Sequence, residues 1–285
     1  MRELRITGDS LEVVLLPDAG ARLHRLRAFG HDLLRTPDDP DTHLRDPFFW
    51  GAYLMAPWSN RVAAQPLTVG SATVDLPSNF ADGTAIHGQV YARPWTVDAD
   101  RITCRCQAGQ DGWPWAYEVI LRATVDDTLL GIRLSLVNRS SAPMPAGLGI
   151  HPWWRRPLLV AIDAEQAYRT NADSPAVAEA VGGVLDLRQL TEPALDLDAT
   201  WTRLGSGGIR LAWPDIGVAA AMTLSGAASH VAVATPREPH ATAIEVQSHA
   251  PDGLRRLLNG ESGALAMLPP GEELVIDVAL AVSRV

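Results

Sequence analysis

Lysine is absent from the 285-residue chain, in which all 24 basic residues are arginine. Without lysine, no side-chain amine can form a Schiff base with a carbonyl substrate or with pyridoxal phosphate. The same absence removes the lysine of a phosphate-binding P-loop, and no glycine-rich fingerprint opens a strand-to-helix unit of the dinucleotide-binding kind. The sequence therefore excludes lysine-based chemistry and argues against nucleotide use.

Cysteine is scarce, with only Cys104 and Cys106, two residues apart. An extended strand would point both side chains to one face. Strand neighbours at this spacing splay along the chain, which disfavours a disulfide, and no further cysteine completes a zinc tetrad. We expect two ordinary buried thiols.

Segments that would anchor or export the chain are also missing. No stretch approaches a membrane span of about 20 apolar residues, and acidic residues interrupt the first 20 positions, unlike a secretory signal. The formal net charge of -9 at pH 7 opposes binding to nucleic acid or an anionic membrane. We expect a cytoplasmic monomer or homodimer that binds a small molecule.

Strand is the dominant pattern, and convincing helical periodicity is almost absent. Only Asp173–Val181 and Asp252–Leu258 could form a turn or two of helix. Short apolar runs bounded by turn residues predict strands at Leu11–Leu16, Val119–Val125, Leu130–Val137, Gly217–Leu224, His230–Thr235 and Leu274–Val282.

Two of these runs predict a hairpin, in which Asp126-Asp127-Thr128 turns the chain between Val119–Val125 and Leu130–Val137. The 23 glycines and 21 prolines are scattered as punctuation, with no linker and no repeat of fixed period. The sequence thus predicts one all-β domain over residues 1–285, built as a large antiparallel β-sandwich.

In four segments, polar residues lie next to proline, glycine, aromatic or apolar residues. Each of these polar residues could have a functional or a purely structural role. Asn60-Arg61 follows a Pro-Trp corner, where Asn commonly caps a turn and Arg pairs with a carboxylate. His87 precedes a glycine that lets another group approach closely. His151 ends a strand that continues into two indoles. Glu245 lies among apolar residues, as either a buried base whose pKa burial would raise or one partner of a surface salt bridge.

Tryptophan supplies nine of the seventeen aromatic residues, beside four Tyr and four Phe. An indole can cover the C–H face of a sugar ring while polar neighbours contact its hydroxyls. Trp153, directly after His151-Pro152, and the Trp113-Pro114-Trp115 segment therefore favour a carbohydrate ligand.

Taken in order, Asn60-Arg61, Ile86-His87-Gly88, His151-Pro152 with its aromatics and the late Glu245 resemble the aldose 1-epimerase family. The resemblance extends to the Asp111–Trp115 turn and to Leu268–Glu272, which is similar to the family's Pro-Gly-Glu turn before the last strand. It implies a galactose mutarotase-like supersandwich.

The resemblance also implies a role for each site residue. His151 would protonate the ring oxygen of a sugar, and Glu245 would take the proton from its C1 hydroxyl. The expected substrate-binding residues are Asn60, Arg61, His87, Trp153 and an aspartate. The match for that aspartate is Asp198 in Asp198-Ala199-Thr200-Trp201, with Asp196 as the alternative.

Acid and base suffice for this chemistry. A cyclic hemiacetal opens when the C1 hydroxyl loses a proton as the ring oxygen gains one, and each positioned group typically supplies about 10²- to 10⁴-fold. The eight histidines show no His-x-x-x-His or His-x-His pair. We therefore expect no metal and no other cofactor.

Three other functions compete with a mutarotase of neutral sugars. Arg61, Arg155 or Arg156 could meet the charge of an anionic sugar such as a sugar phosphate or sulfonate. Glu245 with Asp198 could serve as the two carboxylates of a glycosidase. The fold could also serve a non-catalytic sugar-binding module. Pro152-Trp153-Trp154 and Val246–His249 depart from the better-known galactose mutarotases, which leaves the sugar open.

Overall fold

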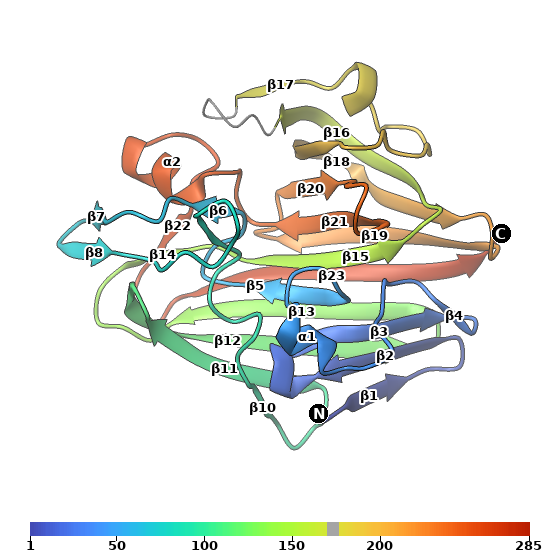
Figure 1. Ribbon diagram of the computed structural model, residues 1–285, viewed down its shortest axis with the longest axis horizontal. Helices are drawn as coiled ribbons and strands as arrows, with labels where there is room; N and C mark the ends of the chain where they lie inside the picture. The colour runs from blue at the N-terminus through green and yellow to red at the C-terminus, as the bar shows by residue number, and fades with distance from the viewer. Residues whose placement is uncertain (170–176) are drawn as a thin grey trace.

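The computed structural model describes residues 1–169 and 177–285. Its main feature is a 17-stranded sheet that curls into two facing layers, with strands that run antiparallel to their neighbours (Figure 1). The predicted all-β architecture is confirmed.

The first layer runs from the edge strand β10 to β19. The ladder order is β10 (Thr96–Val97), β11 (Thr103–Gln110), β12 (Trp113–Asp126), β13 (Leu129–Asn138), β23 (Glu273–Arg284) and β19 (Val218–Gly226). β12 and β13 form the expected hairpin, with Asp126 opposite Leu129.

The second layer contains the strands that will carry the site. Its order is β20 (His230–Ala234), β21 (Ala241–Gln247), β15 (Gly149–Arg155), β5 (Ala52–Met55), β3 (Arg22–Ala28), β2 (Leu11–Leu16) and β1 (Leu4–Thr7), with β4 (His31–Asp32) paired to β3.

One long strand, β18 (Asp198–Trp213), joins the two layers. Its first part pairs with β20 and its last part with β19. Between these parts lies Gly208, whose φ of 61° suits glycine, and a Cβ there would come within 2.4 Å of the Met222 carbonyl oxygen. β16 (Leu159–Arg169) pairs along β18, and β17 (Ala178–Ala180) pairs with β16.

Short elements cover one end of the sandwich and part of its outer face (Figure 1). They are β6 (Arg61–Val62) with β9 (Ala85–Ile86), β7 (Leu67–Val69) with β8 (Ala72–Val74), β14 (Met144–Ala146) with β22 (Ala266–Leu268), α1 (Thr42–Arg45), α2 (Gly253–Asn259) and the 3-10 turns Pro17–Ala19 and Gly183–Leu185. Neither α-helix in the described residues is long and apolar enough to cross a membrane.

The core fills the space between the layers because strand side chains alternate between two faces. Ile150, Ile244 and Val246 of the second layer meet Leu130 and Ile132 of the first. The opposite face of β15 and β21 is thereby left for other contacts.

Most local expectations agree with the structure. All six predicted strands lie in or almost entirely within observed strands, and the expected short helix appears as α2. Cys104 and Cys106 are buried free thiols, and burial raises the pKa of each to about 11. The expected helix over 173–181 lies partly outside the described residues. Its described part is wrong, because β17 pairs with β16 in extended form.

We expect Leu134→Ala to lower the free energy of unfolding by about 2–5 kcal/mol, because Leu134 is fully buried at the middle of β13 and its truncation leaves a cavity. Urea denaturation monitored by tryptophan fluorescence measures the loss. The exposed Leu129→Ala on the same strand is the control, and equal effects of the two substitutions would contradict this location of the core.

Candidate active site

Three neighbouring strands bring the candidate acid and base together. His151 of β15 pairs with Tyr53 of β5, and the β15–β21 register, with Ile150 opposite Val246 and Trp153 opposite Ala243, sets His151 opposite Glu245. These side chains point away from the sandwich core, since their neighbours on each strand point into it.

His151 and Glu245 are in direct contact. Their Nε2 and Oε1 atoms are 3.1 Å apart, and only 4% and 6% of the two residues are exposed. The imidazole of His151 stacks on the Tyr53 ring with a centroid distance of 4.4 Å. Burial in this wall excludes the interpretation of Glu245 as a surface salt bridge.

The pKa of Glu245 differs from the sequence-based expectation. Burial raises this pKa, as expected, but the charge and hydrogen bond of His151, together with His87 and Gln247, outweigh burial and lower the pKa below its ordinary value. The expectation of a raised pKa was wrong because it considered burial without these partners. Glu245 is therefore ionised at neutral pH and available as a base.

His87 and Asn60 hold each other through reciprocal hydrogen bonds. The Asn60 backbone N–H donates to His87 Nδ1 at 3.2 Å, and the His87 N–H donates to the Asn60 carbonyl at 3.0 Å. Both residues have φ of 62°, a left-handed conformation that Asn and His adopt more readily than most residues. Gly88 follows, where a Cβ would come within 2.0 Å of the Ala56 carbonyl oxygen.

This pairing fixes the tautomer of His87. Because Nδ1 accepts a backbone N–H, the ring proton of neutral His87 lies on Nε2, and burial lowers the pKa of His87 to about 3. His87 therefore presents an N–H donor next to His151 and Glu245.

The same tautomer bears on metal binding. The potential ligand atoms of His87, His151 and Glu245 lie within 4.8 Å of one another, and two imidazoles with a carboxylate resemble a site for a divalent metal. A metal needs the lone pair of a ring nitrogen, whereas Nε2 of His87 carries the proton. This donor set fits a hydroxyl-bearing ligand better than a metal.

Asp198 lies on the same face of the sheet as the acid and base. It is opposite Ala234 on β20, which is opposite Ala243 on β21. From the strand spacing, its Cα lies roughly 12 Å from that of Glu245. Asp196 precedes β18 and bonds Arg237 at 3.0 Å. Of the two candidates, Asp198 therefore has the position in the sheet that faces the site.

The arginines considered for an anionic ligand already have partners. Arg61 Nε donates to Asp82 at 2.6 Å, and Arg155 Nη2 donates to Asp215 at 2.7 Å. Arg156 donates to Thr242 Oγ1 and to the Pro236 carbonyl. Arg61 thus has its backbone beside Asn60 while its guanidinium bonds Asp82.

Aromatic side chains surround the acid–base pair, and most of them were not predicted from the sequence. Three of the four phenylalanines and two tyrosines share this cluster with Trp153, whose Nε1 donates to the Phe48 carbonyl at 2.5 Å. The members besides Trp153 are Phe48, Phe49, Phe80, Tyr53 and Tyr91. The Phe48-Phe49-Trp50 run was the sequence feature that could have predicted this cluster, because aromatic residues are few in this chain.

The Trp113-Pro114-Trp115 segment does not belong to this cluster. Trp113 packs against Trp58 in the main core, with ring centroids 5.1 Å apart, and Trp115 packs against Trp113. Using this segment to favour a carbohydrate was therefore wrong, because these indoles fill the sandwich interior. Trp153 retains contact with His151 at a centroid distance of 5.0 Å.

Two further residues of the β21 segment were missed, namely Gln247 and His249. Gln247 Nε2 donates to Glu245 Oε2 at 2.7 Å. His249 Nε2 accepts from the backbone N–H of Ser59 at 3.0 Å. Glu245, Gln247 and His249 follow a period of two residues, the signal that could have placed them on one side.

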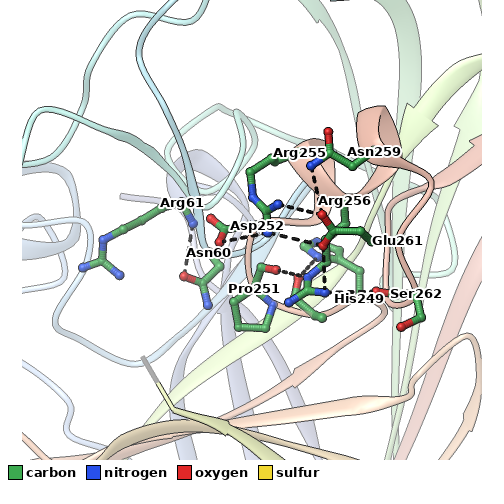
Figure 2. Close-up of polar contacts among 11 residues, drawn as sticks. Asn60, Arg61, His249, Pro251, Asp252, Arg255, Arg256, Asn259, Glu261 and Ser262 are labelled. Atoms are coloured by element: carbon green, nitrogen blue, oxygen red, sulfur yellow. Dashed lines mark hydrogen bonds and ion pairs between the residues drawn. The ribbon is translucent and has the colours of Figure 1, made fainter. Parts of the chain in front are cut away.

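His249 also joins the C-terminal segment to the loop of Asn60 through its bond to Ser59. In that segment Glu261 bonds both Arg255 and Arg256, and the Arg61 side chain points away from this cluster (Figure 2). Gly253 contacts the His249 ring, and a Cβ there would come within 2.5 Å of Nδ1. Segments nearly 200 residues apart in sequence are thereby held together.

Comparison with known proteins identifies relatives of this architecture. The family model described as aldose 1-epimerase matches residues 2–194. A putative aldose 1-epimerase from Escherichia coli K12 superposes with a TM-score of 0.84 at 20% identity, covering 100% of this chain and 99% of that one. An aldose epimerase homologue from Caenorhabditis elegans gives 0.83 at 18% identity, covering 100% and 99%.

A galactose 1-epimerase from Lactobacillus acidophilus gives a TM-score of 0.78 at 15% identity, covering 99% of this chain and 94% of that one. At such low identities, these superpositions show a shared fold and nothing more. No curated protein sequence matches the chain.

The buried histidines predict a loss of stability in acid. Burial lowers the pKa of His43 to about 2, of His87 and His230 to about 3 and of His249 to about 4. In the unfolded chain each returns to about 6.5. The unfolded state then binds more protons, and each histidine removes up to about 1.4 kcal/mol per pH unit below about pH 6.5.

Urea titrations at pH 7.5, 6.5, 5.5 and 4.5 measure this dependence. The unfolding free energy should fall least between the first two values and most steeply between the last two. His249→Gln should reduce the slope. An equal free energy at pH 6.5 and 4.5 would contradict neutral buried histidines.

Proposed function

Since this chain belongs to the aldose 1-epimerase family, we propose that it interconverts the α and β anomers of an aldose by acid/base ring opening and closure. The observation that carries the proposal is the buried contact between His151 Nε2 and Glu245 Oε1 at 3.1 Å. The C1 hydroxyl oxygen and the ring oxygen of a hemiacetal are bonded to the same carbon. An acid and a base that serve them must therefore belong to one site, as the neighbouring side chains of His151 and Glu245 do.

The proposed reaction begins at the C1 hydroxyl. Glu245 takes the hydroxyl proton while protonated His151 donates a proton to the ring oxygen, and the bond from C1 to the ring oxygen breaks. Rotation about the C1–C2 bond presents the other face of the aldehyde. Reversal of both proton transfers closes the ring as the other anomer, so no external proton, electron or group is consumed.

Entry of the sugar changes the environment of Glu245. His151 is the main cause that lowers the pKa of this carboxyl. A ring that lies between the two side chains separates them, so the carboxylate becomes a stronger base when it meets the C1 hydroxyl.

Binding would use the groups around this pair. His87 would donate its Nε2–H to a sugar hydroxyl. Asn60 and Arg61, which lie beside His87, would bind further hydroxyls. Trp153 would pack on the ring. Asp198, on β18 beyond Ala234 of β20 and Ala243 of β21, would accept hydrogen bonds from sugar hydroxyls.

The buried free thiols fit a reducing, cytoplasmic setting.

A neutral aldose is favoured over an anionic sugar. Arg61 and Arg155 bond carboxylates, and Arg156 bonds neutral oxygens of Thr242 and Pro236. A phosphate bound through Arg61 or Arg155 would compete with the carboxylate of Asp82 or Asp215 for the guanidinium. A non-catalytic sugar-binding module would have no use for a buried acid in contact with a base.

We expect Glu245→Gln and His151→Ala each to lower the turnover number by two or more orders of magnitude, because each removes one of the two proton transfers. Polarimetry of freshly dissolved α-glucose, α-galactose and a hexose 6-phosphate measures the approach to equilibrium. Circular dichroism confirms that the variants fold. Near-wild-type rates in either variant would reject its role, and no acceleration by the wild type with any sugar would reject the proposed activity.

Asp198 and Asp196 offer a matched pair of variants. Asp198→Asn should raise KM by about tenfold or more, because it weakens a hydrogen bond between a sugar hydroxyl and a charged acceptor. Asp196→Asn should leave KM unchanged, since that carboxylate bonds Arg237. Initial rates across sugar concentrations give both constants. The reverse ranking would assign sugar binding to Asp196.

A further inference from the structure

Glu245 has a second partner on the side away from His151. Gln247 lies two residues further along β21, so both side chains point to the same face. Its Nε2 donates to Glu245 Oε2 at 2.7 Å, while Oε1 of the same carboxylate meets His151. Each carboxylate oxygen thus has its own partner.

The surroundings of Gln247 restrict its movement. Its side chain belongs to a fully buried residue on β21, between Gly149 of β15 and His230 of β20. Its amide oxygen is buried without a hydrogen-bond partner among the described residues. Burying an unpaired carbonyl is costly, and an apolar side chain of similar length would avoid that cost. The contact that a glutamine adds here is its N–H on Glu245.

We propose that Gln247 is a positioning residue that holds the Glu245 carboxylate in the orientation from which it accepts the proton of the sugar. This inference rests on the proposed mutarotase function. A sugar that enters the site separates His151 from Glu245, whereas the bond from Gln247 lies behind the carboxylate and persists. Gln247 is therefore the partner that fixes the carboxylate plane during the reaction.

The amide suits this task better than a charged donor. The groups that face Glu245 are His151 from β15, His87 after β9, Tyr53 from β5 and Gln247 of its own strand. A charged donor such as an imidazolium can transfer its proton to the carboxylate it bonds. An amide N–H donates a hydrogen bond without giving up its proton, so it stabilises the ionised base without neutralising it.

The kinetic test compares Gln247→Met with Thr242→Val. Methionine keeps the length of the side chain and removes the donor. Thr242 is also buried on β21 but on its opposite face, where it accepts from Arg156. Gln247→Met should lower kcat by about tenfold or more with a smaller change in KM, since the bond to a charged acceptor is lost.

The pH profile separates positioning from general damage to the strand. Loss of the donor raises the pKa of Glu245, so the acidic limb of kcat/KM should move to higher pH in Gln247→Met and remain in place in Thr242→Val. If the methionine variant does not fold, Gln247→Asn replaces it, because its amide is one methylene too short to reach Glu245. An unchanged kcat and acidic limb in a folded variant would overturn the proposal.

A direct titration makes the test independent of turnover. Carbon-13 NMR of glutamate-labelled protein, with Glu245→Gln to assign the resonance, follows the Glu245 carboxyl without sugar. Its pKa should be higher in Gln247→Met than in the wild type, and equal values would overturn the proposal. If the wild type accelerates no anomer exchange, the proposed function fails, and this titration still decides whether Gln247 controls the carboxylate.

Discussion

The register between β15 and β21 is the constraint on which the rest of the site depends. It sets His151 directly opposite Glu245 and brings Tyr53 of β5 into the same row. A shift of one residue on either strand would turn one of these polar side chains into the sandwich core. Burial of Ile150, Ile244 and Val246 on the other face opposes such a shift. Core packing thus holds His151 and Glu245 in contact.

Loops contribute the remaining residues of the site, and polar contacts with buried partners hold these loops in place. Asn60 and His87 bind each other through backbone and ring atoms. Ser59, next to Asn60, is bound by His249 from the far end of the chain. These bonds require neutral imidazoles, so the geometry of the loops that hold Asn60 and His87 and the sensitivity of the fold to acid have the same cause.

The sequence could predict what depends on local patterns. Alternation along Val119–Val125 and Leu130–Val137 was enough for the hairpin, and the order of Asn60, His87, His151 and Glu245 was enough for the family. Features that depend on distant partners could not be predicted. The pKa of Glu245 depends on His151, almost 100 positions away. Trp113 looked equivalent to Trp153 until the sheet placed them on different sides.

The strands and the loops of this site differ in how freely their sequences can change. His151, Glu245 and Gln247 belong to the continuous sheet, where a change of register disturbs the whole sandwich. Phe48, Phe49 and Phe80 lie outside the strands of the sheet, where insertions and exchanges are tolerated far better. Under the proposed function, changes in the loops around 46–50 and 78–84 would alter the preferred sugar without moving His151 or Glu245, which makes these loops the first targets for redesigning selectivity.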